Sequence, residues 1–360
     1  MIQFGIDGPN QSEKWELLFD LLPAQKKSPF FSKAYYDSYS EVEPAEAQCF
    51  WAHQDEHNFL FYPYLKRSIN DLGHSLAREY FDISGAYGYN GPLGVAQDPD
   101  FIQAFNSKLK EYLQDSFVVT EFVRYCPIIE NRHLHSYTEQ INVLDNVYID
   151  IAPGLNKVWD DSFASRVRKT VRKGESYGLR TQFLRGSELS DTNLQVFFEI
   201  YNSTMQRNEA DEFYYFDFQF FKRLRDKLSE MQLLSITYYE DIPISTELIL
   251  LGGELAFGFL GGTLSEYYRY KANTYQRWEL LKHLEPLGFK KYSMGGGAAR
   301  GDSIYDFKMS FSQGCENPFF IGTKVHLPDV YASIISQWEN KYPSAAAKHS
   351  SKLQGYRYTT

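Results

Sequence analysis

The sequence predicts a mixed α/β protein (mixed α+β) of two domains, each with a mixed central sheet flanked by helices. Its 360 residues, 43% of them hydrophobic, are typical of a globular chain with room for two cores. Each half also repeats one order of patterns: helices, then a strand hairpin, then a helix and a strand. We expect domains over residues 1–150 and 151–345, and a flexible polar tail over 346–360.

In the first half, cap and turn residues mark the elements. Ser12 is placed to cap a short helix that Pro23 ends, and Pro99 suits the first position of a helix capped by Asp98. Gly and Pro interrupt regular structure in the segment before that helix. The expected elements are a helix over 13–22, two strands within 47–66, an irregular segment over 80–94, a helix from Asp98 and a strand over 117–125.

In the second half, apolar residues recur at helical spacing in three places and in continuous runs at two others. The runs flank a polar turn, which is typical of a hairpin. The expected elements are a basic helix over 162–177, helices from Ser190 or Asp191 and from Asp217, a hairpin over 232–251, a strand over 255–260, a helix from Asn273 or Thr274 and a strand over 289–294.

Composition excludes several classes of protein. The net charge of −9 disfavours binding of the molecule as a whole to nucleic acid or to an anionic membrane, and no apolar run is long enough to span a bilayer. The first residues do not resemble a signal peptide. The three cysteines, Cys49, Cys126 and Cys315, are too far apart for a zinc motif or a disulfide framework. We therefore expect a cytoplasmic protein without a transmembrane segment or a metal site.

A basic segment is the first candidate for chemistry. Residues 165–173 hold five basic residues and no acidic one. On a helix, Arg166, Lys169 and Lys173 share one face, while Arg168 and Arg172 share another. Arginine binds phosphate oxygens in a bidentate way, so the segment predicts an anion site. The alternative is a solvated helix face that pairs with nearby carboxylates.

A glycine-rich segment is the second candidate. Gly295, Gly296 and Gly297 follow a predicted strand, and backbone without side chains allows a ligand to approach and N–H groups to bind it. The alternative is a plain turn between strands. Seven aromatic residues crowd 211–221, and we assign most of them to the core, but Tyr215 precedes a helix cap and is placed to face a cleft.

The order of these segments resembles a known family. The series runs through the Tyr- and Gly-rich segment 87–93, the basic segment 165–179, NSTMQRN at 202–208, the predicted hairpin, FLGGT at 259–263, KANTYQRWELLKHL and MGGG…DFKMSF. It resembles the FemAB-like proteins of the GNAT acyltransferase superfamily, relatives of the peptidoglycan-bridge aminoacyltransferases. The likeness extends over nearly the whole chain to about residue 320.

The resemblance implies two tandem GNAT-like domains and transfer of an acyl or aminoacyl group to an amine of a cell-envelope precursor or amino sugar. The donor it implies is acyl-CoA, an acyl carrier or aminoacyl-tRNA, and the acceptor is a small or lipid-linked precursor. It gives a functional role to the lysine of Phe307-Lys308. It also implies a basic residue and tyrosines around the precursor's diphosphate; by position the candidates are Arg166, Arg168 or Arg172, and Tyr215. Lys169 and Tyr89 are further candidates for substrate binding.

Two departures from the family pattern keep alternatives open. The peptidoglycan enzymes carry an Asp soon after the Gly-Pro of the first half, but here Gly91-Pro92 has no carboxylate before Asp98. The coenzyme A signature [RQ]xxGx[GA] is absent, because the segment from Arg269 lacks its glycine. A Fem-type enzyme that uses aminoacyl-tRNA and a catalytically silent module that kept the fold are therefore alternative functions.

Aminolysis of an ester or thioester needs a stabilised oxyanion and an acceptor for the amine's proton. We hypothesise that Lys308 is a fixed cation beside the oxyanion. Asp306 or Asp302 would then pair with it or accept the proton. The retained Phe307-Lys308 pair favours an enzyme over the silent module.

Overall fold

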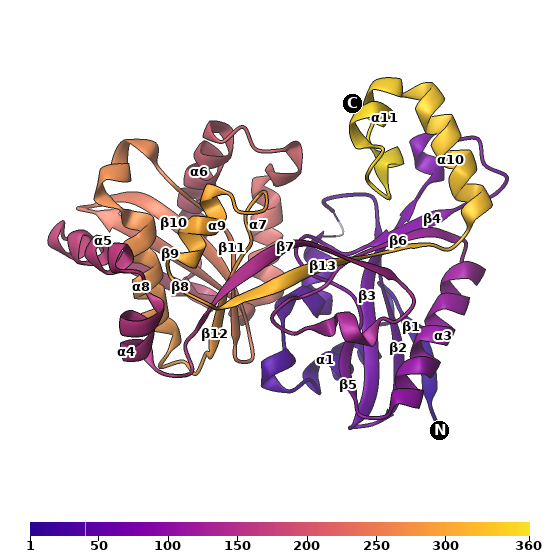
Figure 1. Cartoon of the computed structure of the whole chain (residues 1–360), viewed down its shortest axis with the longest axis horizontal. Helices are drawn as coiled ribbons and strands as arrows, with labels where there is room; N and C mark the ends of the chain where they lie inside the picture. Colours follow the sequence, from indigo (N-terminus) through magenta and orange to yellow (C-terminus); the bar gives the residue numbers. More distant parts are fainter. Residues whose placement is uncertain (40) are drawn as a thin grey trace. The chain divides into compact units, whose positions relative to one another are not determined.

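The computed structural model describes residues 1–39 and 41–360, and the chain forms two compact units (Figure 1). Unit 1 consists of Met1–Leu22, Phe30–Val143 and Phe319–Thr360, and unit 2 of Pro23–Pro29 and Leu144–Pro318. The expected boundary near residue 150 therefore falls at Leu144. The expected second domain also differs at its end, because residues 319–345 belong to unit 1.

Unit 1 is built on a mixed sheet. Its strands follow the order β1-β2-β3-β4-β6-β13, and β5 pairs with β3. Only the β4–β6 pair is parallel among these, and it brings Asp82 beside Thr120. The elements are β1 (Gln3–Asp7), α1 (Glu13–Asp20), α2 (Lys33–Tyr39), β2 (Glu46–Asp55), β3 (Asn58–Ser68), β4 (Phe81–Ser84), β5 (Leu93–Ala96), α3 (Pro99–Asp115), β6 (Val118–Arg124), β13 (Glu316–Val325), α10 (Pro328–Lys341) and α11 (Pro343–His349).

Two cores lie on the two faces of this sheet. Phe101, Phe105 and Leu109 of α3 pack with Val118 in one buried cluster. Val119, the next residue of β6, packs instead with α10, α11 and the C-terminal segment. Successive strand residues point to opposite faces, so α3 and the α10–α11 pair cover opposite sides of β6.

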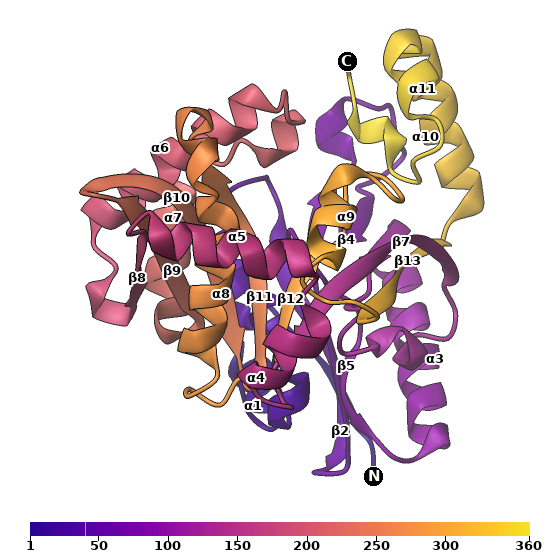
Figure 2. The same ribbon diagram turned by 60° about the vertical axis from the view of Figure 1, so that its left-hand side comes forward.

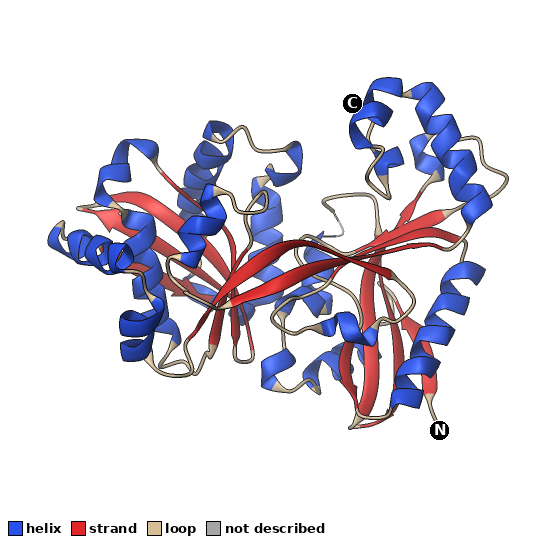
Figure 3. Cartoon of the chain, viewed as in Figure 1, coloured by secondary structure: helices blue, strands red, loops and turns tan. Residues whose placement is uncertain are grey.

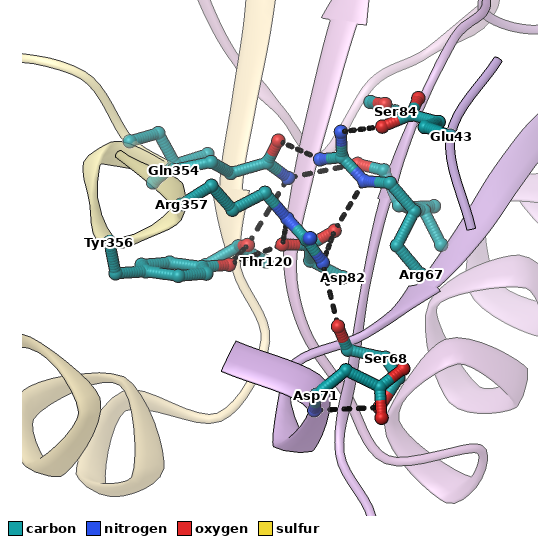
Figure 4. A network of polar contacts seen from close by, with 12 residues as sticks. Glu43, Arg67, Ser68, Asp71, Asp82, Ser84, Thr120, Gln354, Tyr356 and Arg357 are labelled. Atoms are coloured by element: carbon teal, nitrogen blue, oxygen red, sulfur yellow. Dashed lines mark hydrogen bonds and ion pairs between the residues drawn. The ribbon is translucent and has the colours of Figure 1, made fainter. Parts of the chain in front are cut away.

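The C-terminal segment is packed, which corrects the expectation of a flexible tail over 346–360. Residues Gly355–Arg357 form a short 3₁₀ helix, and the Tyr356 side chain is 1% exposed. Figure 4 shows Arg357 and Tyr356 meeting Asp82 of β4, with Arg67 of β3 on the other side of that carboxylate. Gln354 also donates to the carbonyl of Ile83 at 3.1 Å. A composition-based argument could not find these long-range bonds.

Unit 2 contains strands in the order β7-β12-β11-β10-β9-β8, and helices pack on them (Figure 3). Its helices include α8, which packs on β9, β10 and β11, and α6, which packs on β10 and β11. The elements are β7 (Glu139–Asp150), α4 (Leu155–Lys157), the π-helical turn η5 (Val158–Ser162), α5 (Ser165–Ser176), β8 (Arg180–Arg185), α6 (Asp191–Arg207), the 3₁₀ helix η7 (Glu212–Tyr214), α7 (Phe218–Leu228), β9 (Gln232–Tyr239), β10 (Ile242–Gly252), β11 (Leu255–Thr263), the 3₁₀ helix η9 (Ser265–Tyr270), α8 (Ala272–Leu284), β12 (Lys291–Gly295) and α9 (Ser303–Met309).

Local signals predicted most of these elements well. The Asp98 and Asp217 side chains accept hydrogen bonds from Asp100 N at 2.9 Å and Phe220 N at 2.6 Å, as caps at helix starts do. Ser190 caps α6 in the same way. Ser12 also precedes its helix, but its side chain makes no capping bond there. The elements that were not predicted are β1, α2, β7, β8, α9, β13, α10 and α11. The expectation of an irregular segment over 80–94 was wrong in part, because β4 and the start of β5 lie within it.

One parallel pair in unit 2 diverges, and this divergence positions the site. β11 pairs with β12 only over Leu255–Phe257 and Lys291–Ser293. β12 then ends at Gly295, while β11 continues to Thr263 along β10. A bulge between Leu248 and Ile249 of β10 lies opposite the point where the strands separate. On the side away from β10, the second half of β11 is therefore not paired with β12.

Candidate functional site

A cavity of about 510 Å³ lies along the unpaired half of β11. Its lining comes from unit 2 alone: Gly258–Thr263 of β11, the end of α6, the start of α8 with Tyr268 and Lys271 before it, two residues each of β10 and α9, and one residue of β12. The lining includes four basic side chains, Arg207, Lys271, Arg277 and Lys308, and one acidic side chain, Glu247. A cavity with this balance attracts an anionic ligand.

The glycines of β11 make room for the polar groups around the cavity. A Cβ at Gly258 would lie 2.7 Å from Glu247 Oε1 and 2.8 Å from the Tyr292 hydroxyl. A Cβ at Gly262 would lie 2.4 Å from Thr204 Oγ1 and 2.7 Å from the Ile200 carbonyl of α6. Any side chain at these two positions would displace the carboxylate or the end of α6.

Lys308 projects from α9 into the cavity lining. Its Nζ donates to the Gly296 carbonyl at 2.7 Å. Burial, aided by the nearby charge of Arg277, lowers the pKa of Lys308 to about 8, while Glu247 and Asp302 partly oppose that shift. The amine is therefore held at a fixed place and changes its charge close to neutral pH. Perturbed lysines in cavities are typical of functional sites.

Glu247 of β10 is the one carboxylate in the lining, and its side chain is 11% exposed. Its Oε1 accepts a hydrogen bond from the Tyr292 hydroxyl at 2.7 Å and lies 3.7 Å from Arg277 NH2. Burial raises the pKa of Tyr292 well above its usual value, so that hydroxyl remains a hydrogen-bond donor. The arrangement fixes the carboxylate inside the cavity beside two cations.

The start of α8 supplies further anion-binding groups. Ala272, Asn273 and Thr274, the first residues of α8, all line the cavity. The N–H groups of Ala272 and Asn273 carry the partial positive charge of a helix start, whereas that of Thr274 donates to the Lys271 carbonyl at 3.1 Å. Lys271 precedes them in the left-handed conformation (φ 60°). Arg207 completes this end of the cavity, where it lies over the Tyr268 ring, 5.0 Å from its centroid.

The two predicted aspartates are placed differently from Lys308. The Asp306 side chain is exposed and does not line the cavity. Asp302 caps α9: its carboxylate accepts from the N–H groups of Tyr305, Ala298 and Ala299. These hydrogen bonds, led by that of Tyr305, lower the pKa of Asp302. Because these hydrogen bonds stabilise its charged form, the Asp302 carboxylate is a poor proton acceptor.

The basic residues of α5 lie outside the cavity lining. Arg168 has a structural role, because its NH1 donates to the carbonyls of Trp159, Asp160 and Phe163 at 2.9, 3.1 and 2.5 Å. Arg166 donates to the Asp306 carbonyl at 3.0 Å. Lys169 is exposed, and Arg172 lies over the Trp159 ring. The predicted anion site on α5 is therefore separate from the cavity.

The glycine segment lies at the edge of the site. Gly295 ends β12 with φ 70°, and the Gly296 carbonyl accepts the Lys308 hydrogen bond. A Cβ at Gly297 would lie 2.3 Å from Asp302 Oδ1. The segment thus orients Lys308 and the α9 cap. It presents a carbonyl to that lysine, whereas the sequence predicted N–H groups presented to a ligand.

The predicted tyrosines do not join the cavity. Tyr215 follows η7, is 42% exposed and is absent from the cavity lining. Tyr89 belongs to unit 1, where it packs edge-on against Phe30 and Phe319 with centroids 5.2 and 6.0 Å apart. Sequence reasoning missed Glu247, Arg277, Arg207 and Lys271. Of these four residues, only Glu247 could have been identified from the sequence, as the one carboxylate in a predicted strand that is mostly apolar.

Over residues 1–39 and 41–360, no three His, Cys, Asp or Glu side chains gather as metal ligands would. Among the same residues, none of the helices has the length and apolar character of a bilayer-spanning helix.

Comparisons with known proteins agree with the predicted resemblance. Residues 161–309 match the family model described as an acetyltransferase (GNAT) domain. FemX has a similar solved structure, with a TM-score of 0.64 and 13% identity over 86% of this chain and 96% of that one. The C-terminal domain of a putative lysylphosphatidylglycerol synthetase from Agrobacterium fabrum has a TM-score of 0.53 and 12% identity, covering 90% of this chain and 97% of that one.

The structure of L-PGS from Bacillus licheniformis gives a TM-score of 0.52 and 12% identity over 89% and 95% of the two chains. No curated protein matches this sequence. At these identities the structural likenesses establish the fold alone. The predicted mixed α/β class and the resemblance to GNAT and FemX-like proteins are confirmed.

Proposed function

We propose that this chain, whose residues 161–309 match the acetyltransferase (GNAT) model, is an acyl- or aminoacyl-transferase that forms an amide, with the unit 2 cavity as its transfer site. The observation that carries the proposal is Lys308, a buried amine with a pKa of about 8 in a cavity lined by three other cations and one carboxylate. The acceptor that the resemblance implies is an amine of a cell-envelope precursor or amino sugar.

The donor we propose is one with phosphate groups, either acyl-CoA or aminoacyl-tRNA. The start of α8, with Lys271 and Arg207, forms an anion-binding end of the cavity, because helix N-termini and cations both favour phosphate. Phe307 and Lys308 lie on α9, which contributes another part of the lining. A donor with its phosphates at α8 would place its acyl group along the glycines of β11.

The chemistry follows from the side chains in the lining. The neutral amine of the acceptor attacks the carbonyl carbon of the donor, so a C–N bond forms and the negative charge moves to the carbonyl oxygen. Lys308, in its charged form, stabilises that oxygen. The C–S or C–O bond then breaks and the leaving group departs. Glu247 accepts the proton that the amine loses, since it is the carboxylate in the cavity lining.

Calorimetric titration with acetyl-CoA and with free coenzyme A tests the donor. We expect micromolar binding of coenzyme A by the wild-type protein and at least tenfold weaker binding by Lys271→Ala. If coenzyme A does not bind, charged tRNA is titrated in its place. Failure of both donors to bind would overturn the proposed function.

Replacing Glu247 with Gln should lower kcat about 100-fold and leave KM for the donor nearly unchanged. Gln keeps the shape and can still accept from Tyr292, but it cannot take a proton, and general base catalysis contributes about 10²- to 10⁴-fold. The readout is release of the coenzyme A thiol, or of free tRNA, in the presence of acceptor. Tyr292→Phe is the matched control, because it removes the hydrogen bond and keeps the base. Equal rates for Glu247→Gln and wild type would show that Glu247 is not the proton acceptor.

A further inference from the structure

The outward face of α5 is strongly basic. Val167, Val171 and Gly174 are buried where α5 packs on α8, which leaves Lys169 and Arg172 at the exposed side. At 100° per residue, Arg166 and Lys173 lie beside Lys169 on the side away from Arg172, and no acidic residue of α5 falls within the arc of these four side chains. Glu175 lies outside it, next to Arg172. We call Arg166, Lys169, Arg172 and Lys173 the α5 face. It extends over about 10 Å of helix.

Carboxylates do not neutralise this face. In the described part of the chain, none of its four side chains forms an ion pair with a carboxylate, and Arg166 binds only a backbone carbonyl. Asp160 and Asp161 are exposed in η5, next to the face in sequence. Apart from the five basic residues of α5, the chain has a net charge of −14 (−9 minus 5). The positive charge is therefore local.

Two tryptophans border the face. Arg172 lies over the Trp159 ring of η5, 5.6 Å from its centroid, and the Trp159 and Trp278 rings are 4.8 Å apart. Both indoles are half-buried. Figure 2 shows α5 crossing in front of α8, with α4 below it. Trp beside Lys and Arg is typical of segments that lie at a membrane interface.

The face is also next to the walls of the cavity. Trp278 follows Arg277 on α8, and Arg277 lines the cavity while Trp278 packs against Trp159. At the other end, Arg166 binds the Asp306 carbonyl and Ala164 N donates to the Ser310 carbonyl at 2.9 Å. Both carbonyls belong to the segment of α9 that carries Lys308. A surface bound at α5 would thus lie one helix away from the cavity.

We propose that the α5 face docks unit 2 on an anionic lipid surface. A planar bilayer would contact this face alone, and charges farther away than about 8 Å are screened at physiological salt. An RNA partner is less favoured, because Arg172 and Trp278 already lie against the Trp159 ring, which leaves little free surface for stacking on bases. Lipid docking does not depend on the identity of the donor or acceptor.

Vesicle flotation of the full chain tests this proposal. We expect binding to vesicles of 70% phosphatidylcholine and 30% phosphatidylglycerol at 0.1 M salt, with loss of binding at 0.5 M salt and none to pure phosphatidylcholine. Each basic residue at an anionic surface contributes about fivefold. The triple variant Lys169→Gln, Arg172→Gln, Lys173→Gln should therefore bind about 100-fold more weakly.

A triple variant of exposed lysines elsewhere, Lys108→Gln, Lys227→Gln and Lys348→Gln, changes the net charge equally and serves as the control. It should bind vesicles within a few-fold of wild type. Equal losses in both triples, or no binding by wild type, would overturn the proposal, as would binding of duplex RNA at α5 without binding of vesicles. Transfer to a water-soluble acceptor should be the same in wild type and both triples, which separates this test from the proposed function.

Discussion

Lys308→Met should make the protein about 100-fold slower and, at pH 7, more stable by about 1–2 kcal/mol. The rate falls because one fixed cation at the oxyanion is lost, and removal of one such donor costs about 10²- to 10³-fold. Stability rises because burial of a charged amine is unfavourable. The same cost lowers the pKa of Lys308 to about 8. The lost hydrogen bond to Gly296, about 1 kcal/mol, offsets part of that gain.

The pH dependence of this effect has a defined sign. The pKa of Lys308 falls from 10.5 when unfolded to about 8 when folded, so between these values the unfolded chain binds a proton that the folded chain does not. Raising the pH through this window therefore stabilises the wild type, by at most about 3 kcal/mol. The stability advantage of Lys308→Met should be largest below pH 8 and should shrink towards pH 10.5.

Urea unfolding at pH 7 and pH 9.5, together with transfer rates, measures both effects. Lys290→Met is the matched control, because Lys290 is exposed and its replacement should change the free energy of unfolding by less than about 0.5 kcal/mol. Lys308→Arg keeps the charge and should retain more activity than Lys308→Met. A Lys308→Met enzyme with wild-type turnover would show that this lysine has no part in catalysis.

Asp82→Ala should destabilise unit 1 by about 3–5 kcal/mol. Asp82 is fully buried and accepts from Arg67 Nε at 2.9 Å, Arg357 Nε at 2.6 Å and the Tyr356 hydroxyl at 2.7 Å (Figure 4). Removal of the carboxylate would leave the largely buried Arg357 guanidinium without its counterion and Arg67 with Glu43 alone. Breaking a buried pair in this way is strongly destabilising.

Thermal and urea unfolding test this prediction, and Glu43→Ala is the control. Glu43 contacts the same Arg67 at 3.2 Å, but its side chain is 35% exposed, so its loss should cost less than about 1 kcal/mol. Limited proteolysis should also cleave the segment after α11 faster in Asp82→Ala. If the two variants unfold alike, the network around Asp82 does not hold the C-terminal segment in place.

The parts of the fold that the sequence predicted depend on local chemistry. Asp98 and Asp217 cap helices through bonds that reach only two or three residues along the chain. β13 could not be found in this way, because its partner is β6, with Ile321 opposite Arg124. That pairing joins residues about 200 positions apart, and no local pattern records it.

The candidate site was predictable to a similar degree. The family resemblance identified Lys308, which does line the cavity. It also indicated the α5 arginines, but α5 turns them away from the cavity because Val167 and Val171 take its buried side. Glu247 and Arg277 meet only when β10 and α8 pack together, and Gly258 leaves the space for that carboxylate. The spacing of these residues along the sequence does not predict that they meet.

The order of the segments along the chain has a consequence for biosynthesis. Unit 1 begins at Met1, but its β13, α10 and α11 come last, after all of unit 2. During translation the β6 edge, Val118–Arg124, therefore emerges from the ribosome long before its partner strand. Such an unpaired edge is open to wrong pairing with other chains. The residues of unit 2 end at Pro318, so we expect most of that unit to fold first, and truncation before Phe319 should yield an aggregating product.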